Sequence, residues 1–95
     1  MTGSKGRKKR QRLQQCVAEL VNLAREIAPT VKVRELVPYE DEDVILEIHV
    51  PKGFEEQVEE ALSERRFDMF LKEGVFISLQ VIPDEELTVA ERRER

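Results

Sequence analysis

Residues 44–53 have the sequence VILEIHVPKG, and this stretch decides the fold. It begins with a run of β-branched and other apolar residues that is typical of a buried strand. Pro51 and Gly53 end the strand, because proline lacks the N–H that a sheet ladder requires and glycine favours a turn. A helical pattern follows at once. We therefore expect a central strand that turns directly into a helix, with the rest of the chain covering it.

An amphipathic helix is expected before this strand. Apolar residues recur at spacings of three and four from Leu13 to Ile27, which is the period of a helix with one buried face. Pro29 ends the pattern, because a residue that precedes proline is disfavoured in the helical region. The sequence therefore predicts a helix from about residue 8 to residue 28.

Two more strands are expected, over residues 31–37 and 75–82, and each run ends at a proline. A polar turn joins strand 31–37 to strand 44–50, which indicates an antiparallel hairpin. The helical segment between strands 44–50 and 75–82 requires a right-handed crossover, which makes these two strands parallel. Strand 44–50 is then the middle strand of a three-stranded mixed sheet.

The segment 54–72 leaves two alternatives open, one kinked helix or two short helices, because its apolar stripe falters at residues 63–66. With one helix, the fold class is α+β, a two-layer α-β-β-α-β sandwich that carries both helices on one face of the sheet. An incomplete ferredoxin-like sheet fits this order.

With two helices, the order α-β-β-α-α-β resembles the type II KH-like modules, which include ribosome-binding factor A. The resemblance implies binding of structured RNA. It covers the order of elements over most of the chain and transfers no residues, because the GxxG loop of KH domains is missing. Residues 63–66, at the corresponding place, have the sequence SERR.

Alternation along the strands predicts which side chains face the helices. The inward set is Val31, Val33, Val37, Val44, Leu46, Ile48, Val50, Val75, Ile77, Leu79 and Val81. The opposite, open face carries Lys32, Arg34, Leu36, Ile45, Glu47, His49, Phe76, Ser78, Gln80 and Ile82. A bare, mixed face of this kind favours a partner, often a second copy of the chain.

The net charge of −4 conceals a strong division along the chain. Residues 1–12 form a basic flexible arm without acids that runs into the first helix, residues 13–83 form a single α+β domain, and residues 84–95 form a charged tail. The arm is a candidate for contacts with nucleic-acid phosphates. The residues concerned are Lys5, Arg7, Lys8, Lys9, Arg10 and Arg12.

Four of the five residues 67–71 are large and apolar, and successive residues on a helix differ by about 100°. At least two of them are expected to pack in the core, and at least one should point to solvent or to another subunit. Together with the open sheet face, this gives six candidate interface residues: Leu36, Ile45, Phe67, Phe70, Phe76 and Ile82.

No catalytic, metal or cofactor site is expected, and no small-molecule substrate is evident. Cys16 lies on the apolar stripe of the first helix, where a thiol is buried and protonated. His49 shares a strand face with Glu47 and is interpreted as a solvent-facing side chain. Lys52-Gly53 is interpreted as a tight turn, and the acidic residues 40–43 as a solvated hairpin turn.

The chain is expected in the cytoplasm, because it has no apolar run of the ~18 residues that span a bilayer and no apolar segment after its basic start.

Our first hypothesis is a small non-catalytic protein-interaction module that forms a homodimer or homo-oligomer through its open sheet face and residues 67–71. The alternative is an RNA- or DNA-associated protein that contacts phosphates with its basic arm.

Overall fold

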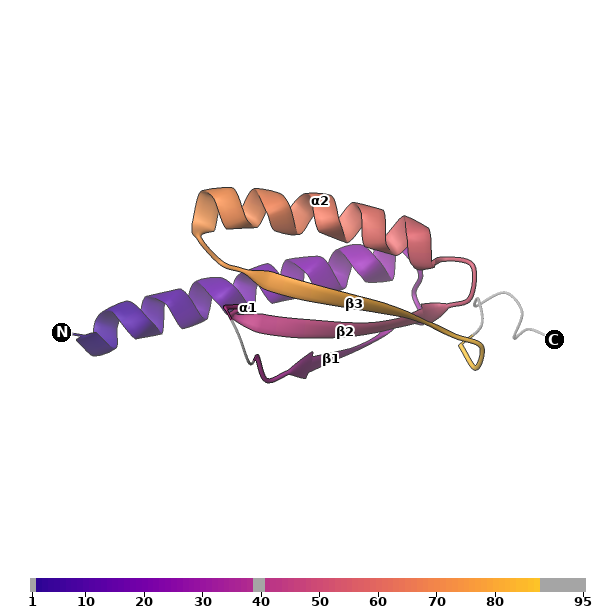
Figure 1. Ribbon diagram of the computed structural model, residues 1–95, viewed down its shortest axis with the longest axis horizontal. Helices are drawn as coiled ribbons and strands as arrows, with labels where there is room; N and C mark the ends of the chain where they lie inside the picture. Colours follow the sequence, from indigo (N-terminus) through magenta and orange to yellow (C-terminus); the bar gives the residue numbers. More distant parts are fainter. Residues whose placement is uncertain (1, 39–40, 88–95) are drawn as a thin grey trace.

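The computed structural model describes residues 2–38 and 41–87, with side chains from Arg10 onward. Its elements follow the order α-β-β-α-β (Figure 1). They are α1 (Thr2–Ile27), β1 (Lys32–Leu36), β2 (Val44–Pro51), α2 (Glu55–Glu73) and β3 (Ile77–Asp84). The predicted α+β fold and element order are confirmed.

The sheet has the strand order β1-β2-β3, so β2 is central as predicted. β1 pairs with β2 in antiparallel register, with Val33 opposite Ile48. β2 pairs with β3 in parallel register, with Leu46 opposite Leu79. The parallel pairing follows from the crossover through α2, which returns the chain to the end of the sheet where β2 began.

Both helices lie on one face of the sheet and pack against each other (Figure 1). β2 is buried along almost its whole length, and only Glu47 and His49 are half-buried. Its inward residues Leu46 and Val50 have no exposed surface and join Leu20 of α1 and Leu62 of α2 in one apolar core. Burial of each such side chain stabilises the fold by roughly 1.5–3 kcal/mol.

α2 is one continuous helix from Glu55 to Glu73, so the two-helix alternative is wrong. The polar stretch at residues 63–66 consists mostly of good helix formers and does not break the helix. The element order that resembled type II KH-like modules is therefore not present. Gly74 ends the helix in the left-handed conformation, with φ of 72°, and its N–H donates to the carbonyl oxygen of Phe70.

The βα turn at Lys52-Gly53 is confirmed. Gly53 has φ of 100°, which only glycine adopts readily. Its N–H donates to the carboxylate of Glu55 at 2.6 Å. The start of α2 is therefore occupied by an acidic residue of the chain itself, which is the favourable sign of charge at this end of a helix.

α1 begins at Thr2, several residues before the predicted start near residue 8. Lysine, arginine and glutamine are good helix formers, and extending a helix costs much less than starting one. Figure 1 shows that this N-terminal end of α1 projects beyond the sheet and α2. At the other terminus, β3 extends to Asp84, and the predicted tail lies largely outside the described residues.

Three side chains depart from the predicted faces of the sheet. Phe76, predicted on the open face, precedes β3, and its ring lies 5.9 Å from that of Phe70 on α2. Val37 is 84% exposed, because β1 already ends at Leu36 and its ladder no longer directs Val37 toward the helices. Ile45 is on the open face but is only 3% exposed, since it lies between Leu36 and Ser78 on the flanking strands. It is therefore not accessible as the interface residue that the sequence predicted.

Shortening Leu46 to alanine should lower the free energy of unfolding by about 2–5 kcal/mol, because it leaves a cavity beneath both helices. The matched control, Val37→Ala, removes apolar groups from an exposed side chain and should change this free energy by less than about 0.5 kcal/mol. Urea unfolding followed by circular dichroism measures both. Similar losses in the two variants would contradict this account of the core.

Candidate interaction surfaces

The largest exposed apolar feature of the described residues lies on α2. Phe67, Phe70 and Leu71 are 59%, 48% and 65% exposed. They are spaced i, i+3 and i+4 and therefore share one face of the helix. We call these three residues the α2 ridge. Of the four large apolar residues at 67–71, only Met69 is buried in the core, so the expectation that at least two of them pack there is wrong.

The ridge arises because α2 contributes little to the core in its last two turns. Its buried residues are Val58, Leu62 and Met69, which form a narrow stripe. The rings of Phe70 and Phe76 lie 5.9 Å apart in a tilted arrangement, so Phe76 extends the apolar surface toward β3. Phe76 is held by Asp43, whose carboxylate accepts from its N–H at 2.8 Å. A fixed apolar surface of this kind is typical of a contact site.

The same outer side of α2 is acidic toward its N-terminus. Four glutamates there are exposed, and none of them has an ion-pair partner among the described residues. We call them the acidic strip: Glu56, Glu59, Glu60 and Glu64. The strip repels itself, because like charges three and four residues apart on a helix are neighbours.

Two other acids of α2 form ion pairs within the chain. Asp68 lies 3.6 Å from Arg65 and 3.5 Å from Lys72. Glu73 lies 3.2 Å from Arg12, one of the predicted phosphate contacts. Glu55 accepts from the N–H of Gly53. The remaining negative charge of α2 that lacks a partner in the described part of the chain is concentrated in the acidic strip.

The remaining predicted phosphate contacts lie on the projecting end of α1. Arg10 is exposed, and the other four are on helical backbone whose side chains are outside the description. We call these five the basic segment: Lys5, Arg7, Lys8, Lys9 and Arg10. The first turn of α1 contains no acidic residue, so these cations add to the positive end of the helix dipole. The positive charges repel one another and the positive helix end, and an anionic partner would relieve this repulsion.

The open face of the sheet is polar at its centre. Arg34 and His49 both contact one carboxylate oxygen of Glu47, at 3.0 Å and 3.1 Å. The other ring nitrogen of His49 lies 3.8 Å from Asp84. The predicted interface residues Leu36 and Ile82 are half-buried at the two sides of this network. The structure therefore does not gather Leu36, Ile45 and Ile82 into one exposed apolar patch.

The hydrogen bond with His49, followed by the contact with Arg34, holds the pKa of Glu47 below its ordinary value of 4.5. His49 is a half-buried residue on the open face of the sheet, between two carboxylates. Within residues 2–38 and 41–87, no three histidine, cysteine, aspartate or glutamate side chains gather closely enough to hold a metal ion.

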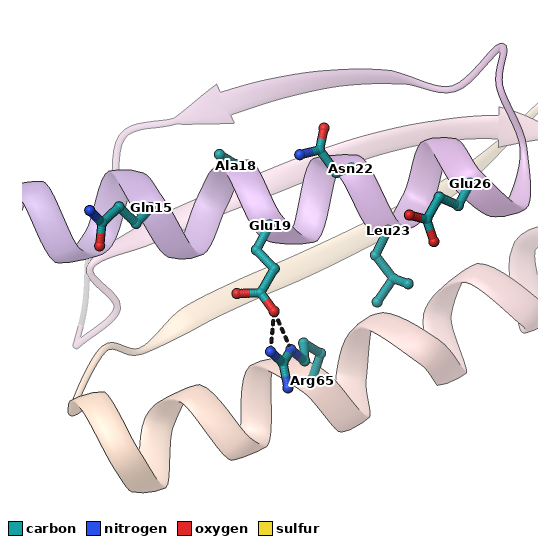
Figure 2. A pocket seen from close by; sticks show the side chains of 7 residues that line it. All are labelled: Gln15, Ala18, Glu19, Asn22, Leu23, Glu26 and Arg65. Atoms are coloured by element: carbon teal, nitrogen blue, oxygen red, sulfur yellow. Dashed lines mark hydrogen bonds and ion pairs between the residues drawn. The ribbon is translucent and has the colours of Figure 1, made fainter.

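A shallow groove of about 540 Å³ runs between the helices (Figure 2). Its lining residues are Gln15, Ala18, Glu19, Asn22, Leu23, Glu26 and Arg65. Arg65 of α2 crosses the groove and donates to the carboxylate of Glu19 on α1 (Figure 2). The pair connects the two helices, which explains its position without a ligand. Cys16 is buried beside it, and burial raises the pKa of its thiol.

Comparisons with protein-family models, curated proteins and solved structures found no match. In the part of the chain that the structure describes, neither helix is long and apolar enough to cross a membrane. The function is therefore inferred from the surfaces described above.

Replacing Glu47 with glutamine should reduce stability at about pH 7 and have no effect in strong acid. The reason is that a lowered pKa in the folded state stabilises the fold above the ordinary value of 4.5, and this contribution disappears as pH falls through the lowered pKa. Urea unfolding at a series of pH values measures the difference. Glu35→Gln, an exposed residue of β1, is the control. A difference that grows toward low pH would contradict the assignment.

Proposed function

We propose that this chain is a small, non-catalytic protein-interaction module that self-associates, and that the α2 ridge is its main contact surface. The observation that carries this proposal is the exposure of three large apolar side chains on one face of α2. Leaving such side chains in water forgoes roughly 1.5–3 kcal/mol for each one that could be buried. A partner that covers the ridge recovers part of this free energy.

The ridge supports self-association better than the open sheet face does. Ile45 is already covered within the chain, and the centre of the sheet face holds the charged pair of Arg34 and Glu47. Charged groups are depleted at the centres of interfaces because burying them is costly. We therefore assign the sheet face at most a peripheral role, whereas Phe76 adjoins the ridge through its ring contact with Phe70.

Several features support a non-catalytic role in the cytoplasm. Cys16 is buried, and its raised pKa keeps the thiol protonated and unreactive. A free cysteine suits a reducing compartment. His49 contacts two carboxylates on a polar, open surface. Water can reach any group bound there, whereas active sites commonly exclude water from the reacting groups.

The double variant Phe67→Gln/Leu71→Gln should convert a self-associated species into a monomer at about 100 µM chain, because it removes the centre of the contact. Glutamine keeps the net charge and suits a helix. Light scattering coupled to gel filtration gives the mass. The control Val37→Gln makes the same kind of change at an exposed apolar residue outside α2 and should leave the mass unchanged. A monomeric wild-type chain at this concentration would contradict the proposal.

A second candidate function is binding of RNA or DNA phosphates, and one observation favours it. The basic segment lies on a helix that projects beyond the body of the domain (Figure 1). A projecting cationic helix can approach a polyanion while the acidic body stays at a distance. This function would use Lys5, Arg7, Lys8, Lys9 and Arg10, because Arg12 is already paired with Glu73.

Changing the five basic-segment residues to glutamine tests this second function and preserves the pair of Arg12 and Glu73. Fluorescence anisotropy with single-stranded RNA and duplex DNA should show wild-type binding that weakens steeply with salt, with a logarithmic slope of about −0.7 per contact on single strands. The variant should bind neither. Lys32→Gln/Lys52→Gln/Lys72→Gln, at exposed sites elsewhere, is the control. Equal binding by the five-residue variant would remove this function.

A further inference from the structure

We infer that the partner on the α2 ridge is a second copy of this chain, packed with its α2 antiparallel to the first. In this arrangement the basic segment of each copy faces the acidic strip of the other. This inference rests on the proposed function and specifies the geometry of the same contact.

The ridge is suited to meet itself. A twofold contact brings the same patch of both copies together, so the patch must be self-complementary. Phe67, Phe70 and Leu71 are apolar, and two of the charged residues among and beside them, Asp68 and Lys72, are paired with each other at 3.5 Å. The ridge residues themselves carry no charge, so two ridges can meet through apolar groups, with Glu64 and Arg66 at the edge of the contact.

Charge selects the antiparallel direction. The acidic strip lies entirely on the N-terminal side of the ridge, from Glu56 to Glu64. Two parallel α2 helices would place both strips side by side, and like charges across an interface disfavour it. Two antiparallel helices that meet at their ridges direct the strips away from each other. Each strip then extends past the C-terminal end of the partner's α2.

The basic segment projects in that same direction. Glu19 meets Arg65, and Arg12 meets Glu73, so α1 and α2 of one copy are antiparallel. Residues 2–11 of α1 therefore continue past the C-terminal end of α2 (Figure 1). With a rise of ~1.5 Å per residue they cover about 15 Å, which is comparable to the span of roughly 12 Å from Glu56 to Glu64.

Pairing within one copy cannot achieve this neutralisation. The basic segment lies beyond the C-terminal end of α2, whereas the acidic strip occupies its N-terminal half. The core contacts of both helices with the sheet fix this separation. The strip of another copy, in contrast, can come close to the segment. The opposite charges at the two ends of the domain therefore identify a second copy as the occupant of the ridge.

A charge-swap experiment tests the arrangement on the full chain. One variant reverses part of the strip, Glu59→Lys/Glu60→Lys/Glu64→Lys, and retains Glu56 near the positive end of α2. The other reverses part of the segment, Lys5→Glu/Lys8→Glu/Arg10→Glu. A control, Glu26→Lys/Glu35→Lys/Glu86→Lys, changes the net charge as the first variant does, at exposed sites elsewhere. Sedimentation velocity gives the dissociation constants, and circular dichroism verifies folding.

Each reversed variant alone should associate at least about tenfold more weakly than wild type, and an equimolar mixture of the two should recover the wild-type affinity, because both contacts are again of opposite sign. The wild-type constant should also weaken about tenfold between about 50 mM and about 500 mM NaCl. The control should associate as wild type does.

A mixture that associates no better than either variant would overturn this arrangement. If Phe67→Gln/Leu71→Gln still abolishes association in that case, the ridge remains the contact and only the pairing of segment and strip is wrong. If wild type is monomeric throughout, the proposed function fails together with this inference.

Discussion

The burial of β2 beneath two helices is the constraint on which the rest of this structure depends. Leu46, Ile48 and Val50 have almost no exposed surface, and they contact side chains from both helices in one core. A chain of 95 residues can bury only one such centre. Both helices must therefore lie on the same face of the sheet, and the opposite face is left to polar cross-strand pairs such as Arg34 and Glu47.

This single core also explains the outer side of α2. A helix that covers one edge of a small sheet needs only a narrow apolar stripe, which Val58, Leu62 and Met69 provide. The side chains of Phe67 and Leu71 lie outside this stripe, so they stay in water unless another molecule covers them. The ion pair between Arg65 and Glu19 limits movement of α2, because it helps to hold α2 in its orientation against α1.

Most of the fold could be predicted from the sequence because local patterns and the core agree. The position of β2 was predicted from the apolar residues around Leu46 and from Pro51 and Gly53 after them. The crossover rule then predicted that β3 pairs with β2 in parallel. What could not be predicted depends on contacts between distant residues. Ile45 is covered by neighbours on two other strands. The continuity of α2 was left open for a different reason, because the apolar stripe falters at residues 63–66 although these residues are mostly good helix formers. The exposure of Phe67, Phe70 and Leu71 was predicted only as a necessity for at least one apolar residue, since periodicity does not show how wide the core is.

The parallel pairing of β2 and β3 has a consequence for synthesis of the chain. The hairpin of β1 and β2 is complete at Pro51, but Val44 finds its partner Ile77 only after all of α2 has been made. Proteins are synthesised from the N-terminus at roughly 5–20 residues per second. For the seconds before β3 emerges, one side of the nascent central strand has no neighbour. The domain therefore closes only after β3 has been made, and a ribosome that stalls within α2 would leave β2, the most apolar strand, open to other chains.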